Sequence, residues 1–115
     1  MPHIIIEYSE DIISHEGAKL LVDTVFVAAE ESGMFEPLNI KVRAVPVRVY
    51  RLGLSAEGFI HVQCRIHAGR PTETKKALTS DIINTLRDLS IDVAVITAEA
   101  VDMDRESYSK YCKDA

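Results

Sequence analysis

The sequence has no tryptophan, only two cysteines among its 115 residues, and no apolar run near the ~18 residues that a membrane span needs. Its start, MPHIIIEYSE, lacks the basic segment and the long apolar stretch of a signal peptide. Neither Cys64 nor Cys112 has a second cysteine nearby, so we expect both to be reduced. A net charge of −5 without a lysine- and arginine-rich block disfavours nucleic-acid binding. The sequence therefore predicts a cytoplasmic protein that binds neither nucleic acid nor a membrane.

Hydrophobic periodicity alternates between strand and helix patterns along the chain. Strands are predicted at Pro2–Tyr8, Ile40–Tyr50, Phe59–Ala68 and Ile91–Ala98, with Pro46 marking an edge or a bulge. One helix is predicted from Gly17 to Ser32 after the N-cap Ser14, and a second opens at 69–72 with an apolar stripe from Ala77 to Leu89. The tail, with Met103, Tyr108 and Tyr111, is interpreted as a short helix that packs on a neighbour.

The order of these elements is β-α-β followed by β-α-β, which indicates a duplicated unit. We predict a single α+β domain over residues 1–115, with pseudo-repeats at about 2–52 and 58–100 and a C-terminal tail. The four strands form one sheet with both helices on one face. Because the other face is left bare, we expect sister subunits to cover it.

Pro2 is the first candidate for chemistry. Removal of the initiator methionine before this small residue would expose a secondary amine at the start of a buried strand, and nearby cations would lower the pKa of that amine toward the range of a general base. The alternative is that Pro2 merely begins the chain. A metal site is disfavoured, since His61 and His67 are separated by roughly 20 Å along one strand. No glycine-rich phosphate loop is present.

Three cations are candidate anion-binding residues. Arg70 stands at the junction AGRPT (residues 68–72), where a guanidinium and free helix N–H groups favour a carboxylate. Lys41 and Arg43 are two residues apart and share one face of a strand, which can form a cationic wall. The alternative for all three is a solvated surface position.

Four segments in register resemble one known family, the 5-carboxymethyl-2-hydroxymuconate delta-isomerases of the tautomerase superfamily. They are the start PHIIIEYS (2–9), the turn GMFEPL (33–38), the strand IKVR (40–43), and FIHV (59–62) leading to AGR (68–70). The resemblance covers nearly the whole chain. Its most specific parts are the amino-terminal Pro-His strand and the Ala-Gly-Arg junction, which a helix bearing Glu73 follows.

The resemblance implies a tautomerase/MIF-like fold, a homotrimer without a cofactor, and Pro2 as acid and base. It assigns the substrate carboxylates to Arg70 and to the position of Lys41. The implied reaction moves a proton in an unsaturated 2-hydroxy or 2-oxo acid with two or three carboxylates, as in aromatic catabolism. Alternatives are another superfamily reaction on a smaller enol acid, or a non-catalytic trimer that only binds small anions.

The sequence also departs from the family pattern. Lys41 stands where an arginine is expected, so either Lys41 or Arg43 takes that role. The loop Leu52–Gly58 is shorter than in the family and is expected near the enclosed substrate. If Met1 is retained, Pro2 is a tertiary amide without a basic nitrogen.

Overall fold

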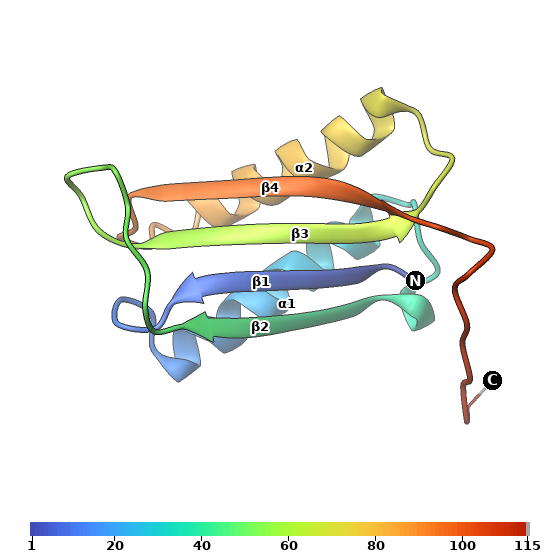
Figure 1. Ribbon diagram of the computed structural model, residues 1–115, viewed down its shortest axis with the longest axis horizontal. Coiled ribbons are helices and arrows are strands. Elements are labelled where there is room, and N and C mark those ends of the chain that lie inside the picture. The colour runs from blue at the N-terminus through green and yellow to red at the C-terminus, as the bar shows by residue number, and fades with distance from the viewer. Residues whose placement is uncertain (115) are drawn as a thin grey trace.

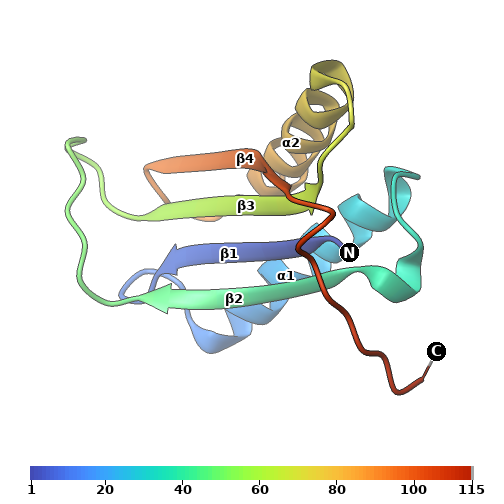
Figure 2. The ribbon, with the colours of Figure 1, turned by 45° about the vertical axis from the view of Figure 1, so that its right-hand side comes forward.

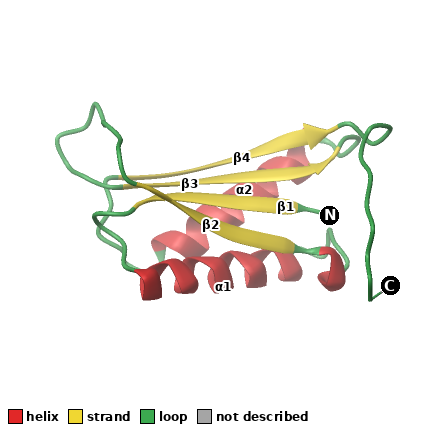
Figure 3. Ribbon diagram, turned by 60° about the horizontal axis from the view of Figure 1, so that its bottom comes forward, coloured by secondary structure: helices red, strands yellow, loops and turns green. Residues whose placement is uncertain are grey.

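The computed structural model describes residues 1–114, which form a four-stranded mixed sheet and two α-helices. In chain order the elements are β1 (His3–Ser9), α1 (His15–Glu31), a 3₁₀ turn η1 (Pro37–Asn39), β2 (Lys41–Val47), β3 (Phe59–His67), α2 (Thr72–Arg87) and β4 (Val95–Met103). The strand order is β2-β1-β3-β4, with β1 antiparallel to β3 and each outer strand parallel to its neighbour (Figure 1). Both helices cover one face of the sheet (Figure 3), as predicted.

The core lies between this sheet face and the helices. Along β3 the alternating residues Ile60, Val62, Cys64 and Ile66 are fully buried, and the side chains between them face the open side of the sheet. The core also includes Leu21 and Val25 of α1, Ile82 and Leu86 of α2, and Ile4 and Ile6 of β1. The apolar residues that repeat every second position in the strands and about every 3.6 positions in the helices therefore form one apolar layer.

Local signals fix the helix ends. The Ser14 hydroxyl accepts a hydrogen bond from the backbone N–H of Gly17 at 3.1 Å, so Ser14 is the N-cap of α1 as predicted. Gly33 follows the helix with a φ of +72°, a conformation that favours glycine. Pro71 precedes α2, whose first turn needs no N–H from it.

Three predicted boundaries were wrong. Strand β2 ends at Val47 instead of Tyr50, and β4 spans Val95–Met103 instead of Ile91–Ala98. The start of β4 is delayed because the backbone N–H of Ala94 bonds to the carbonyls of Glu57 and Gly58, which holds the preceding residues in a loop. The tail from Asp104 to Asp114 contains turns but no helix.

Other predictions were confirmed. Pro46 lies in β2, which is an edge strand of the described sheet, so its missing N–H costs no ladder bond on the outer side. Cys64 is buried, Cys112 is exposed and both are free. The observed element order is the one from which the duplication was inferred, and the duplication itself stays a prediction. Neither helix among residues 1–114 is long and apolar enough to cross a membrane.

Candidate active site

The amino terminus lies at one end of the sheet, in the parallel pairing of β1 with β2. Pro2 is fully buried, and its carbonyl accepts a hydrogen bond from the backbone N–H of Lys41 at 3.2 Å. The amino group of Met1 donates to the carbonyl of Asn39 at 2.9 Å. Because Met1 is present, the nitrogen of Pro2 is part of an amide bond here, and the free amine belongs to Met1.

Lys41 lies beside this amine. Its Nζ donates to the same Asn39 carbonyl oxygen at 2.8 Å, so one oxygen binds two amino nitrogens and holds them close together. Burial first, and then the charge of Lys41 and its hydrogen bond, lower the pKa of the Met1 amine from its ordinary 8.0 to about 6, with a smaller effect of Lys110. This end of the sheet therefore keeps an amino group largely unprotonated at neutral pH.

Arg43 takes a different place from Lys41 on the same strand face. It is exposed, and its Nη1 lies 3.3 Å from Nδ1 of His3, which pairs across the sheet with Lys41. Burial, followed by the charges of Arg43 and Lys41, lowers the pKa of His3. Of the two candidate cations on β2, Lys41 is the one that contacts the carbonyl holding the amino terminus.

Arg70 follows β3 at the same end of the sheet, because β1 and β3 are antiparallel. Gly69 has a φ of +119°, which lets the chain turn there without strain. The Nη2 of Arg70 donates to the carbonyl of Met34 at 3.0 Å, and its guanidinium carbon lies 5.1 Å from the centre of the Phe35 ring. Arg70 is thus anchored on the turn after α1, and the cations that act on the amino-terminal amine are Lys41 and Lys110.

The C-terminal tail contributes residues to this end that sequence reasoning did not place there. The tail passes the start of β1 (Figures 1 and 2). The Tyr108 hydroxyl lies 2.9 Å from Nε2 of His3, and Nζ of Lys110 donates to Oδ1 of Asn39 at 2.9 Å. The only sequence signal was the spacing of aromatic residues in an otherwise polar tail, which gave no direction for the chain.

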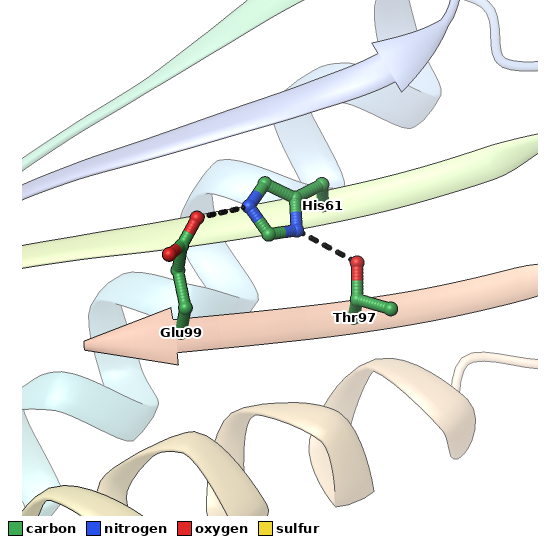
Figure 4. Close-up of polar contacts among 3 residues, drawn as sticks. All are labelled: His61, Thr97 and Glu99. Atoms are coloured by element: carbon green, nitrogen blue, oxygen red, sulfur yellow. Dashed lines mark hydrogen bonds and ion pairs between the residues drawn. The ribbon is translucent and has the colours of Figure 1, made fainter. Parts of the chain in front are cut away.

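The histidines do not form a metal site. His61 lies on the open face of the sheet, where its two ring nitrogens contact Thr97 at 2.7 Å and Glu99 at 2.6 Å (Figure 4). His67 packs edge-on against the ring of Tyr108, with ring centres 5.2 Å apart. Among residues 1–114, no group of three or more histidine, cysteine or acidic side chains is placed to hold a metal ion.

A hollow of about 320 Å³ is lined by Asp11 and by residues between 48 and 57, which follow β2 at the opposite end of the sheet from the amino terminus. Three of its polar side chains are paired, since Arg48 binds Glu10 at 3.1 Å and the Tyr50 hydroxyl donates to Asp11 at 2.8 Å. Within one chain, the loop Leu52–Gly58 lies at the opposite end of the sheet from the amino terminus (Figure 1), and its expected place near the substrate stays a prediction. The amino-terminal end is the better candidate for a reactive site.

Comparison with known proteins gives one family. The family model described as 5-carboxymethyl-2-hydroxymuconate isomerase matches residues 2–107. Comparison with curated protein sequences found no match.

Three similar solved structures share the fold. A 5-carboxymethyl-2-hydroxymuconate isomerase from Deinococcus radiodurans R1 has a TM-score of 0.80 at 21% identity, covering 96% of this chain and 88% of that one. A 5-carboxymethyl-2-hydroxymuconate delta-isomerase has a TM-score of 0.70 at 20% identity, covering 99% and 89%. A fused 4-OT wild-type symmetric trimer has a TM-score of 0.79 at 15% identity, covering 95% and 93%.

Proposed function

The chain belongs to the 5-carboxymethyl-2-hydroxymuconate isomerase family and is an isomerase, and from this premise we propose that Pro2, freed by removal of Met1, is its acid and base. The proposed substrate is an unsaturated 2-hydroxy or 2-oxo acid with at least two carboxylates. The delta-isomerase of similar fold bears the name of such a compound, a carboxymethyl-hydroxymuconate.

The observation that carries this proposal is the lowered pKa of the amino-terminal amine. Burial and Lys41 bring the pKa of the Met1 amine to about 6. Loss of Met1 moves the free nitrogen one residue inward, to Pro2, which is fully buried and paired with the backbone of Lys41. The same two causes then act on a secondary amine. A base with a pKa near or below neutral is unprotonated at the operating pH and can still return the proton it accepts.

The proton transfer needs no other reactant. The Pro2 nitrogen takes the proton of the 2-hydroxyl group, the electrons of the broken O–H bond form the C2 carbonyl, and the conjugated double bonds shift by one position. The resulting prolinium returns the proton to a carbon of the chain, so atoms and charge balance. During the transfer negative charge spreads over the dienolate and is stabilised best by fixed cations.

We assign the substrate carboxylates to Lys41 and Arg70, with Arg43 further along the face of β2. Lys41 supports this role by its contact with the carbonyl that holds the amino terminus. Arg70 lies at the same end of the sheet and is held by Met34 and Phe35. A lysine gives one point charge where arginine gives a planar pair of donors, so we expect the Lys41 side to bind a carboxylate less rigidly.

We also propose that the protein is a homotrimer in the cytoplasm. The open face of the sheet carries Ile5, Val45 and Val101 between polar side chains, and the tail covers it only at His3 and His67, which Tyr108 contacts. One structure of the same fold is a symmetric trimer. Three sheets whose open faces meet would bury this surface.

The test begins with the intact mass of protein from its native host, which should lack Met1. The rate is then followed as the loss of ultraviolet absorbance of a dienol dicarboxylate. Pro2→Ala should lose at least about a hundredfold in kcat, within the range of a general base. Arg70→Ala should raise KM and slow the reaction. Pro46→Ala, at the exposed edge of β2, is the matched control and should keep the wild-type rate.

A chain that retains Met1 is the sharpest comparison, because every side chain is kept while the Pro2 nitrogen becomes an amide. It should be inactive. Full activity with Met1 in place, or unchanged rates in Pro2→Ala and Arg70→Ala, would exclude the proposed mechanism and favour an anion-binding trimer. Turnover of a smaller enol acid in preference to the dicarboxylate would favour the alternative superfamily reaction.

A further inference from the structure

Tyr108 is the one described residue of the tail, Asp104 to Asp114, that is half-buried, while its neighbours are exposed. Its hydroxyl contacts His3, the residue after Pro2, and its ring packs edge-on against His67. The tail is held on both sides of it. Nε of Arg105 donates to the carbonyl of Ala68 at 2.8 Å, and Lys110 binds Asn39. Tyr108 is therefore fixed beside the amino-terminal site by contacts before and after it in sequence.

The direction of the hydrogen bonds follows from the chemistry of the donors. A guanidinium can only donate, so Nδ1 of His3 must accept from Arg43. Burial and neighbouring cations lower the pKa of His3, which keeps the ring neutral at pH 7. A neutral ring that accepts at Nδ1 carries its proton on Nε2 and donates it to the Tyr108 oxygen.

The consequence is a free donor. Because the Tyr108 oxygen already accepts from His3, the phenolic proton of Tyr108 is available to another acceptor, and no protein acceptor contacts it among the described residues. Arg43, His3 and Tyr108 form a chain of hydrogen bonds that ends at this O–H group. Lys41 and Lys110 both bind oxygens of Asn39 at this end of the sheet, so an anion there would meet both positive charge and an O–H donor.

We propose that Tyr108 donates a hydrogen bond to a carboxylate of the substrate, and that the tail carrying Tyr108 and Lys110 is a specificity-determining part of the site. This inference rests on the proposed function for the nature of the substrate. It adds residues of the tail to a substrate-binding site for which Pro2, Lys41 and Arg70 were proposed above. His3 is a positioning residue, because it acts by orienting the Tyr108 hydroxyl.

The experiment measures binding without turnover. Adipate, a saturated six-carbon dicarboxylate, has no enol proton and serves as an inert probe in calorimetric titration of the protein lacking Met1. Tyr108→Phe keeps the ring against His67 and removes only the hydroxyl, so the fold should be preserved. Loss of a hydrogen bond to a charged group should raise the Kd for adipate about tenfold or more. KM for the dienol dicarboxylate should rise in parallel, with a smaller change in kcat.

Tyr111→Phe is the matched control, because Tyr111 lies in the same tail and is 88% exposed. It should leave the Kd unchanged. A second pair addresses His3: His3→Gln retains a donor near the position of Nε2 and should bind adipate more tightly than His3→Leu. A purely structural role of Tyr108 would leave the Kd of the folded Phe variant at the wild-type value, which would overturn the inference.

The two proposals fail in different ways. If the wild-type protein binds adipate and turns over the dienol acid but Tyr108→Phe does so equally well, the role of Tyr108 is refuted and the proposed function stands. If the wild-type protein binds no dicarboxylate and has no activity, both are refuted.

Discussion

Replacement of Lys41 by methionine tests the electrostatics of the amino-terminal site without assuming any reaction. The Met1 nitrogen and Lys41 Nζ lie 2.9 and 2.8 Å from one carbonyl oxygen, so they are at most about 5.7 Å apart. At that separation two unit charges repel by about 0.7 kcal/mol in water and about 3 kcal/mol at an effective dielectric constant of 20. One pKa unit corresponds to about 1.4 kcal/mol, which brackets the effect of Lys41 between about half a unit and two units.

The structure narrows this bracket. Burial is the largest single cause of the lowering of the Met1 pKa from 8.0 to about 6, and the charge and hydrogen bond of Lys41 follow it, so Lys41 supplies only part of this lowering. Because removal of a nearby positive charge favours the protonated amine, Lys41→Met should raise the pKa by about half a unit or more. The pKa should stay below 8.0, since the burial is unchanged.

The assay is an NMR titration of the Met1 Cα resonance in protein made with methionine aminopeptidase inhibited, so that Met1 is retained. Lys113→Met removes the same charge from an exposed tail position and should leave the Met1 pKa unchanged. An amine that titrates near 8.0 in the wild-type protein would refute the reasoning, as would an identical pKa in the wild type and Lys41→Met.

Three further predictions follow from burial. In protein lacking Met1, kcat/KM should rise with pH through the pKa of the Pro2 amine. The midpoint should lie below the ordinary pKa of an amino terminus, because burial and cations favour the unprotonated base. A value of kcat/KM that falls over that pH range would contradict this prediction. Leu86→Ala should lower the free energy of unfolding in urea by about 2–5 kcal/mol, while Leu38→Ala, at a position 96% exposed, should change it by less than about 0.5 kcal/mol. Burial raises the pKa of the Cys64 thiol to about 12. An aromatic disulfide reagent at pH 8 should therefore modify only Cys112 in the folded protein, and both thiols after unfolding in guanidinium. Rapid reaction of two thiols without denaturant would refute the buried position of Cys64.

The fold was predictable because each element carries a strong periodic signal. The alternation from Ile60 to Ile66 could only be a strand with one buried face, and the stripe from Leu78 to Leu86 could only be an amphipathic helix. The start of β4 was not predictable in this way. Ile91 and Val93 are as apolar as the strand residues, and it is the pairing of Ala94 with the carbonyls of residues 57 and 58 that decides where the strand begins.

The candidate site was predictable only where residues lie within or beside regular elements. Pro2 and Lys41 are neighbours because parallel strands β1 and β2 start together, a relation that the order of elements implies. Tyr108 and Lys110 reach the same place through an irregular tail, whose path depends on single hydrogen bonds to His3 and Asn39. Such contacts leave no periodic trace in the sequence, so the tail was assigned to a neighbouring subunit.

The two β-α-β units differ in what they place at the shared end of the sheet. The first begins with Pro2, whose nitrogen is the proposed base, a role that requires the removal of Met1. The second begins inside the chain at Phe59 and cannot supply an amine. Because β1 and β3 are antiparallel, the end of β3 lies beside the start of β1. The turn after β3 is therefore the place where Arg70 can join the amino terminus at one end of the sheet. A net charge of −5 is compatible with an anion site for the same reason: the topology gathers Lys41, Arg70 and Lys110 at this end, whatever the sum over the chain.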